Sequence, residues 1–125
     1  MTQHDNNTVI KIFGYCSWSL DRLNAAIKRN RPEEILNADG QFVVVGEDAR
    51  SAVIVTSRGG VVPYFYTCLG PNVTHGETLL DVFSRSGFQW QWNIRSLGDY
   101  LALDHVIGED TLHEHIKRTV PNSVI

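Results

Sequence analysis

The chain has 125 residues, enough for one hydrophobic core and too few for two catalytic domains joined by a linker. Hydrophobic residues make up 42% of it and charged residues 20%, which indicates a globular protein and excludes the disordered and fibrous classes. The formal net charge of -3 provides no positive field for phosphates or anionic lipid, so we expect neither nucleic acid nor a membrane as partner.

The first thirty residues predict a tail, a strand and a helix. Residues 1–7 form a polar tail, and residues 8–16 are apolar on both faces of an extended chain, which predicts a buried strand. Apolar side chains then recur at helical spacing behind Ser17 or Ser19 as a cap. This pattern predicts a helix over residues 20–30.

The next part of the chain predicts a short helix and a sheet. Pro32 is followed by two glutamates, as in the first turn of a helix, and this helix should end near Asn37. Residues 41–46, 51–57 and 62–69 are rich in β-branched and aromatic side chains, with short loops between them. These three segments predict an antiparallel meander.

Glycines mark the later turns, and helical spacing returns after them. Residues 59–60 and 70–72 are expected to form turns in which glycine adopts a positive φ. Residues 78–86 have apolar side chains at helical spacing, with Gly87 as a C-cap. Residues 89–93 alternate polar and aromatic side chains, which predicts a short extended segment.

Two more helices are predicted near the end of the sequence. Ser96 can cap a helix over residues 97–103, and Thr111 can open a short helix that runs through Ile116. The whole pattern predicts an α+β fold, an antiparallel sheet with packed helices, in one domain over residues 1–125.

The sequence also predicts a compartment. Its start lacks the basic and apolar regions of a secretory signal, and no apolar run approaches the roughly 20 residues that cross a bilayer. We therefore expect a cytoplasmic protein. Cys16 and Cys68 are expected to be reduced, with a disulfide between them as the less favoured alternative.

The histidines are candidate metal ligands. His113 and His115 flank Glu114, and His75 and His105 lie earlier in the sequence. On the predicted helix, residues two apart diverge by about 200°, whereas a pair of helical ligands needs a spacing of four. Solvated histidines on a polar helix are the favoured interpretation, and no metal site is expected.

Three other features are candidates for a chemical role. Residues 58–61 (RGGV) contain two glycines but no phosphate-loop motif, so a tight turn explains them. Cys16 lies at a strand-to-helix junction where amide groups could activate a thiol, but no histidine follows at a motif-defining position, which favours a packed thiol. Trp90 and Trp92 lack interleaved basic residues, which favours packing in a core or protein interface over nucleic-acid stacking.

Several short motifs occur in a fixed order along the chain. Residues 36–45 (LNADGQFVVV) join a leucine to a Gly-x-Phe and an apolar strand, and residues 56–66 (TSRGGVVPYFY) follow. The second segment resembles the signature Arg-Asp-Arg-x-Gly-x-x-Pro-Leu-Tyr-Tyr of class II glutamine amidotransferase domains, in particular those that begin asparagine synthetases. Four of its positions are kept: Arg58, Gly60, Pro63 and Tyr66. It departs at Thr56 and Ser57, where the family has Arg and Asp.

Later segments extend the resemblance. Residues 75–80, 97–103 and 110–121 are similar to the family's Ala-Ser-Glu helix, its Tyr-Leu helix and its closing segment, so the similarity spans residues 9–125. The resemblance implies half of the αββα sandwich of N-terminal-nucleophile (Ntn) hydrolases. In that fold the four motif residues of the signature are expected to be structural.

The residues that the family uses for chemistry have no counterparts here. Its enzymes begin with a cysteine whose α-amine activates its own thiol, whereas Thr2 follows Met1 here. A threonine nucleophile, exposed by removal of Met1, is the less favoured alternative. Residues 13–15 (FGY) stand where the family has Asn-Gly-Glu. The first part of the domain and an ATP-binding Ser-Gly-Gly-x-Asp-Ser loop are also missing.

The resemblance therefore implies a module that is catalytically silent as an amidase and that binds a protein partner or acts as an accessory. We expect no catalytic, cofactor-binding or metal residue, and no cofactor. One alternative is a detached subunit of an amide-forming or macrolactam-forming ligase. Another is a homodimer in which two truncated sheets cover each other.

Overall fold

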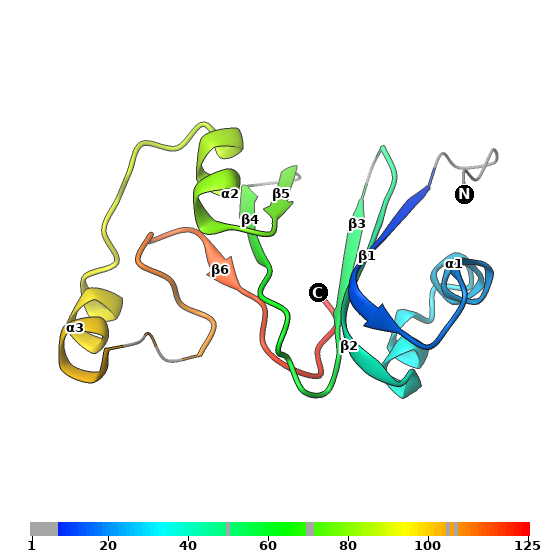
Figure 1. The fold of residues 1–125 in the computed structure, drawn as a ribbon. Coiled ribbons are helices and arrows are strands. Elements are labelled where there is room, and N and C mark those ends of the chain that lie inside the picture. The colour runs from blue at the N-terminus through cyan, green and yellow to red at the C-terminus, as the bar shows by residue number, and fades with distance from the viewer. Residues whose placement is uncertain (1–7, 50, 70–71, 105, 107) are drawn as a thin grey trace. The chain divides into compact units, whose positions relative to one another are not determined.

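The computed structural model describes residues 8–49, 51–69, 72–104, 106 and 108–125. The chain divides into two compact units: Met1–Val62 with Pro121–Ile125, and Pro63–Val120. Each unit contains a three-stranded antiparallel sheet and at least one helix (Figure 1). The expectation of an α+β protein is therefore confirmed, and the expectation of one domain stays a prediction. Within the described residues, no helix has both the length and the apolar character needed to cross a membrane.

The sheet of the first unit has the strand order β1-β2-β3, from β1 (Val9–Cys16), β2 (Gly40–Glu47) and β3 (Ala52–Thr56). The central strand β2 pairs antiparallel with both neighbours. Its apolar residues 42–45 are buried, although successive side chains point to opposite faces.

Strand β1 differs from the prediction of burial on both faces. Val9 and Tyr15, which share one face of β1, are exposed, so this face is not covered at the two ends of the strand. On the other face, Ile10 and Ile12 pack against the core. Period-two alternation is therefore the correct description of this strand.

Helix α1 (Leu20–Lys28) and the 3-10 helix η1 (Pro32–Asn37) follow the predicted segments. Ser19 is the N-cap of α1, whereas Ser17, the other candidate, accepts a hydrogen bond from the backbone N–H of Asp39 at 2.9 Å. The two helices and the sheet share one core of buried side chains: Leu23, Ala26, Ile35, Phe42, Val44 and Val55. Complete burial of a Leu, Ile, Val or Phe side chain stabilises the fold by roughly 1.5–3 kcal/mol.

The free edge of β3 is covered by the C-terminal residues and not by the next strand in sequence. Ile54 and Ile125 exchange two backbone hydrogen bonds, of 3.0 and 2.8 Å. The prediction that residues 62–69 complete a meander is therefore wrong: β4 (Phe65–Leu69) begins later and belongs to the second sheet. The pairing of distant segments cannot be read from local composition.

The sheet of the second unit has the order β5-β4-β6, with β5 (Asn72–Gly76) and β6 (Lys117–Arg118) on either side of β4. Tyr66 in β4 lies opposite His75 on one side and Lys117 on the other. The sequence did not predict β5, because NVTHG shows no alternation of apolar and polar residues. Gly70 and Pro71, where a turn was predicted, lie outside the described residues.

Helix α2 (Leu79–Ser86) follows its prediction and packs on β4 and β5. Thr78 is the N-cap, and its Oγ1 accepts a hydrogen bond from the N–H of Asp81 at 3.1 Å. Gly87 ends the helix with φ 79°, a left-handed conformation that favours glycine.

Helix α3 (Ile94–Leu103) begins earlier than predicted. Asn93 is the N-cap, and its Oδ1 accepts a hydrogen bond from the N–H of Ser96 at 3.1 Å. Ser96, the predicted cap, is buried in the first turn. Asn and Ser are equally good caps, so composition alone does not separate the two positions.

Residues 111–116 do not form the predicted helix. The hydroxyl of Thr111 donates to the carbonyl of Ile116 at 2.6 Å and accepts from the N–H of His113 at 3.1 Å. Such local bonds from a threonine side chain compete with helical backbone bonds. The segment is extended at His113, which forms an antiparallel bridge with Trp92, and then turns before β6.

Candidate functional site

The second unit carries a hollow of about 380 Å³ beside β4 and β6. A volume of this size suits a small molecule. Tyr66 and Cys68 come from the same face of β4, because side chains alternate along a strand. Seven residues line the hollow: Tyr66, Cys68, Phe88, Gln91, Glu114, His115 and Lys117.

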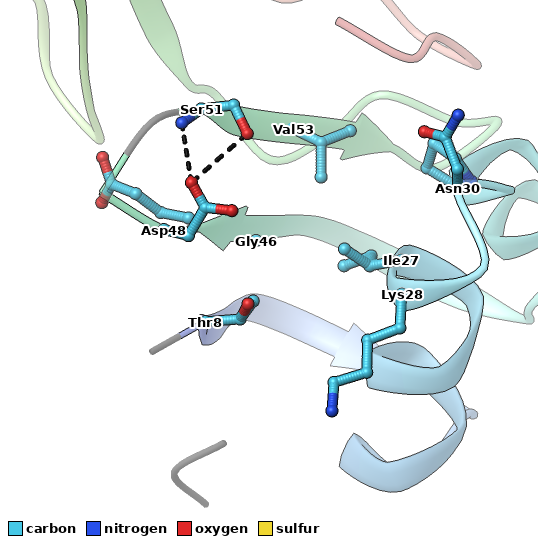
Figure 2. A pocket seen from close by; sticks show the side chains of 10 residues that line it. Thr8, Ile27, Lys28, Asn30, Gly46, Asp48, Ser51 and Val53 are labelled. Atoms are coloured by element: carbon cyan, nitrogen blue, oxygen red, sulfur yellow. Dashed lines mark hydrogen bonds between the residues drawn. The ribbon is translucent and has the colours of Figure 1, made fainter. Parts of the chain in front are cut away.

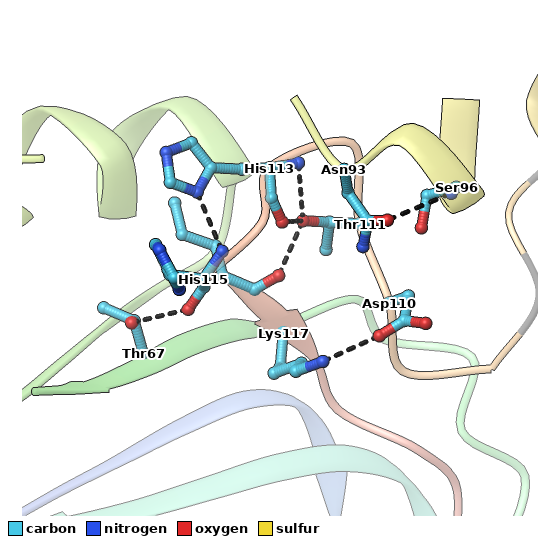
Figure 3. A network of polar contacts seen from close by, with 9 residues as sticks. Thr67, Asn93, Ser96, Asp110, Thr111, His113, His115 and Lys117 are labelled. Atoms are coloured by element: carbon cyan, nitrogen blue, oxygen red, sulfur yellow. Dashed lines mark hydrogen bonds and ion pairs between the residues drawn. The ribbon is translucent and has the colours of Figure 1, made fainter. Parts of the chain in front are cut away.

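Lys117 provides a fixed positive charge at this hollow. Its Nζ lies 2.7 Å from Oδ1 of Asp110 (Figure 3). The hydrogen bond to Asp110 raises the pKa of Lys117, the charge of Glu109 acts in the same direction, and partial burial opposes both. The side chain therefore stays an ammonium at neutral pH and does not serve as a base.

Tyr66 lies opposite Lys117 in the sheet and provides a neutral phenol. Burial raises the pKa of Tyr66, and the nearby Glu109 and Cys68 raise it further, while Lys117 lowers it. At neutral pH this phenol keeps its proton and can donate a hydrogen bond to a ligand.

A chain of hydrogen bonds fixes the backbone beside the hollow (Figure 3). The N–H of His115 donates to Nδ1 of His113 at 3.1 Å, and the hydroxyl of Thr67 donates to the carbonyl of His115 at 2.6 Å. Because Nδ1 of His113 accepts, its ring proton is on Nε2, which donates to the carbonyl of Gln89 at 3.3 Å. Both ring nitrogens of His113 are therefore used within the protein.

The exposed side chain of His115 has one ring nitrogen engaged by a neighbour. Its Nε2 lies 3.2 Å from Oε1 of Gln91, and an amide oxygen only accepts, so Nε2 carries the proton.

His113 is not a solvated histidine, and that prediction is wrong: it is 0% exposed. Its ring stacks on Phe88 at 5.7 Å between centroids and meets the edge of Trp90 at 5.0 Å. Phe83 lies 5.6 Å from the same ring, and Trp92 lies 5.4 Å from Trp90. The histidine is part of an aromatic cluster, where its two hydrogen bonds replace those lost to water.

The described histidines do not gather into a metal site. Within the described ranges, no group of three or more His, Cys, Asp or Glu side chains is placed to hold a metal ion. His75 is buried, and its Nδ1 lies 2.7 Å from the hydroxyl of Tyr64. His105 lies outside the described residues.

The two cysteines are free and differ in environment. Cys16 packs against the core of the first unit, and burial raises the pKa of its thiol, although a backbone hydrogen bond at Trp18 lowers it. The thiol is therefore protonated at neutral pH, which is unsuitable for a nucleophile. Cys68 is exposed and lines the hollow of the second unit.

The first unit has a hollow of its own, of about 270 Å³, shown in Figure 2. Asp48 lies at its rim, and its Oδ1 accepts hydrogen bonds from the N–H and the hydroxyl of Ser51, at 2.8 and 3.4 Å. The N–H of Asp48 donates to the carbonyl of Ser51 at 2.9 Å. These bonds close the connection between β2 and β3, so a structural role explains the polar side chains there.

The sequence predicted only part of the hollow in the second unit. Tyr66 was expected to be structural, Glu114 entered only as the neighbour of two candidate metal ligands, and neither Gln91 nor Lys117 was predicted as a site residue. The alternation that joins Tyr66 to Cys68 could have been read from the sequence. The remaining residues meet only through the pairing of β4 with β6 and the turn before β6.

The other motif positions lie in or next to connecting segments. Gly60 has φ 60°, and a side chain there would collide with the ring of Pro121. Arg58 is exposed, and Pro63 precedes β4.

Comparison with protein-family models, curated proteins and solved structures finds no match to this chain.

Proposed function

We propose that this chain is a binding or accessory module, catalytically silent as an amidase, with the half αββα arrangement of an asparagine-synthetase-type glutamine amidotransferase domain. The order of the motifs over residues 9–125 supports the family. Two small antiparallel sheets with helices are compatible with it.

The main support for the proposed function is the protonation of the side chains that line the hollow beside β4. Lys117 is held as an ammonium by Asp110, and Tyr66 is held as a neutral phenol. Cys68 is a thiol at this hollow, and it makes no hydrogen bond to a base within the described residues. These groups can bind a ligand, but they do not include a nucleophile that is hydrogen-bonded to a base.

The same groups indicate the ligand chemistry. The ammonium of Lys117 and the phenol of Tyr66 can both donate to a carboxylate, with the carboxylate of Glu114 as an opposing negative charge in the same lining. The ring of Phe88 offers an apolar surface next to these donors. We therefore propose a small ligand, or the end of a polypeptide, in which an anionic carboxylate is joined to an apolar group.

A glutaminase assay tests the silent-amidase part of the proposal. We expect the pure protein to release no more ammonia from glutamine than a heat-killed control. Release above the control would contradict it, and the variants Cys16→Ala and Cys68→Ala would then show which thiol is responsible.

A titration followed by ¹H–¹⁵N NMR tests the binding part. Phenylacetate should shift the amide signals of His115 and Lys117, whereas benzylamine, which reverses the charge on the same ring, should not. We expect Lys117→Met to weaken phenylacetate binding about tenfold, the usual order for a charge-assisted hydrogen bond of about 1.4 kcal/mol. Lys11→Met is the matched control, because Lys11 is an exposed lysine of β1. Equal shifts with both probes would reject the carboxylate ligand.

The ligase subunit is a second candidate, favoured by one observation: the resemblance reaches the closing segment over residues 110–121, where the family domain leads into its synthetase part. Co-expression with a protein that carries a Ser-Gly-Gly-x-Asp-Ser loop should then give a stable complex with amide-forming activity. Separate elution of the two chains would reject this candidate.

A further inference from the structure

Helix α3 presents apolar residues to solvent. Its fully buried residue is Ser96, whereas Ile94 is 73% and Leu101 is 77% exposed. Gly98 and Ala102 are also exposed, and no heavy atom lies within 4 Å of the position where a Cβ of Gly98 would stand. We name these four residues, Ile94, Gly98, Leu101 and Ala102, the α3 strip.

The α3 strip lies on one face of the helix. Its members are spaced by four, three and one residues, which places them within an arc of about 100°. In α1, by contrast, Leu23 and Ala26 are buried in the core of the first unit. A contiguous apolar face turned to solvent is typical of an interaction surface.

The flank of the strip carries one charge of each sign. Arg95 and Asp99 are four residues apart and therefore lie on the same side of the helix. Neither forms an ion pair within the described residues. When two identical helices pack antiparallel about a twofold axis, the same flanks face each other in reverse order, so Arg95 of one copy meets Asp99 of the other.

We infer that α3 is a self-association surface, on which a second copy of this chain packs its own α3 antiparallel through the α3 strip. Gly98, near the centre of the helix, lets the two backbones approach closely, and Ile94 of one copy then meets Leu101 of the other. The charged flank favours a second copy of this chain as the partner, because the same surface provides both Arg95 and Asp99 for the ion pairs between the copies. Ile94 and Arg95 also line a hollow with Asp110 and Lys117, but the inference does not rest on the ligand proposed for the hollow beside β4.

Analytical ultracentrifugation of the full chain tests this surface. A single helix pair is at the small end of specific interfaces, so we expect a reversible dimer with a dissociation constant between about 1 µM and 1 mM. The weight-average mass should rise from 14.1 kDa toward twice that value over this range. A wild-type chain that keeps the monomer mass at 1 mM would overturn the inference, and it would leave a different partner protein as the occupant.

Two variants distinguish association through α3 from non-specific association of exposed apolar side chains. Leu101→Glu should remain a monomer at every concentration. Leu80→Glu is the matched control, because Leu80 is a 69% exposed leucine of α2, outside the α3 strip, and this variant should dimerise as the wild type does. Both side chains are exposed, so circular dichroism should show each variant folded. Equal behaviour of the two variants would overturn the proposed surface.

Charge reversal tests the antiparallel arrangement. Arg95→Glu and Asp99→Lys should each weaken self-association at least tenfold, because like charges then face each other across the axis. A mixture of the two variants should associate at least as tightly as the wild type, because an acidic flank then meets a basic one. A mixture no tighter than either variant alone would contradict the pairing of residues 95 and 99.

Discussion

The hydroxyl of Thr111 makes three hydrogen-bond contacts inside the second unit: it donates to the carbonyls of Ile116 and His113, at 2.6 and 3.1 Å, and accepts from the N–H of His113 at 3.1 Å. It is 5% exposed and joins the carbonyl of Ile116 to the N–H of His113. Water has little access to these groups, so both would lack a partner if the hydroxyl were removed. One side chain thus holds the turn that leads into β6 and positions the backbone beside His115.

Thr111→Val should lower the free energy of unfolding by about 2 kcal/mol, because it leaves a buried donor and a buried acceptor unsatisfied. Urea unfolding followed by fluorescence measures this difference. Thr74→Val is the control: Thr74 lies in β5, and its hydroxyl makes no hydrogen bond within the described residues, so little change is expected. Equal losses in both variants would contradict the role of the Thr111 hydroxyl.

The two thiols should differ in reactivity. Burial raises the pKa of Cys16 above its ordinary value, so its thiolate fraction is below that of a free cysteine at every pH, whereas Cys68 is exposed. At pH 7.5, iodoacetamide should label Cys68 first, and labelling of Cys16 should rise only as the pH passes above about 8.5. Mass spectrometry of time courses between pH 6 and 10 measures both rates. Faster labelling of Cys16 at neutral pH would return it as a candidate nucleophile.

The helices of this protein show two opposite uses of glycine. Gly87 ends α2 with a positive φ, and Gly98 lies inside α3, where its φ is not positive. Neither position has a heavy atom near the place of a Cβ. Any effect of an added methyl group is therefore conformational and does not come from a collision.

Gly87→Ala should destabilise the protein by about 1–2 kcal/mol, because alanine must then adopt the left-handed conformation. Gly98→Ala should stabilise α3 by about 0.5–1 kcal/mol, because alanine has the higher helix propensity. Thermal unfolding at low protein concentration, where the chain is a monomer, compares the two variants. Shifts of the same sign would contradict this assignment of the two glycines.

The sequence predicted correctly those helices that are determined by residues close together in the chain. Capping and apolar spacing located α1, η1 and α2, and Gly87 marked the end of α2. The failures are the elements that depend on a distant partner. β4 was assigned to the wrong sheet, and residues 111–116 were assigned to a helix although Thr111 and the pairing with β4 impose a turn.

The hollow at Lys117 was harder to predict for the same reason. Its lining comes from three separate parts of the sequence: residues 66–68, 88–91 and 114–117. Only the pair Tyr66 and Cys68 shares a local pattern. The exposure of α3 was also unpredictable, because helical spacing locates an apolar face without showing whether another element covers it.

At the scale of the whole chain, the first unit is assembled from both ends of the described sequence. Residues 121–125 belong to it although residues 63–120 lie between them and β3 in sequence. The C-terminal backbone extends the sheet: the N–H of Thr56 donates to Ser123, and Ile54 bonds to Ile125 in both directions. The edge of β3 is therefore protected by residues that are the last to be synthesised among those described.

Removing one backbone donor tests this protection. Ile125→Pro deletes the N–H that donates to the carbonyl of Ile54 at 2.8 Å, and proline cannot replace it. We expect the amides of Ile54 and Thr56 to exchange with solvent about tenfold faster, since the net contribution of such a bond is about 1.4 kcal/mol. Ile125→Val keeps the N–H and should leave the rates unchanged. If proline and valine gave the same exchange rates by NMR, the C-terminal residues would not hold the edge of β3 in solution.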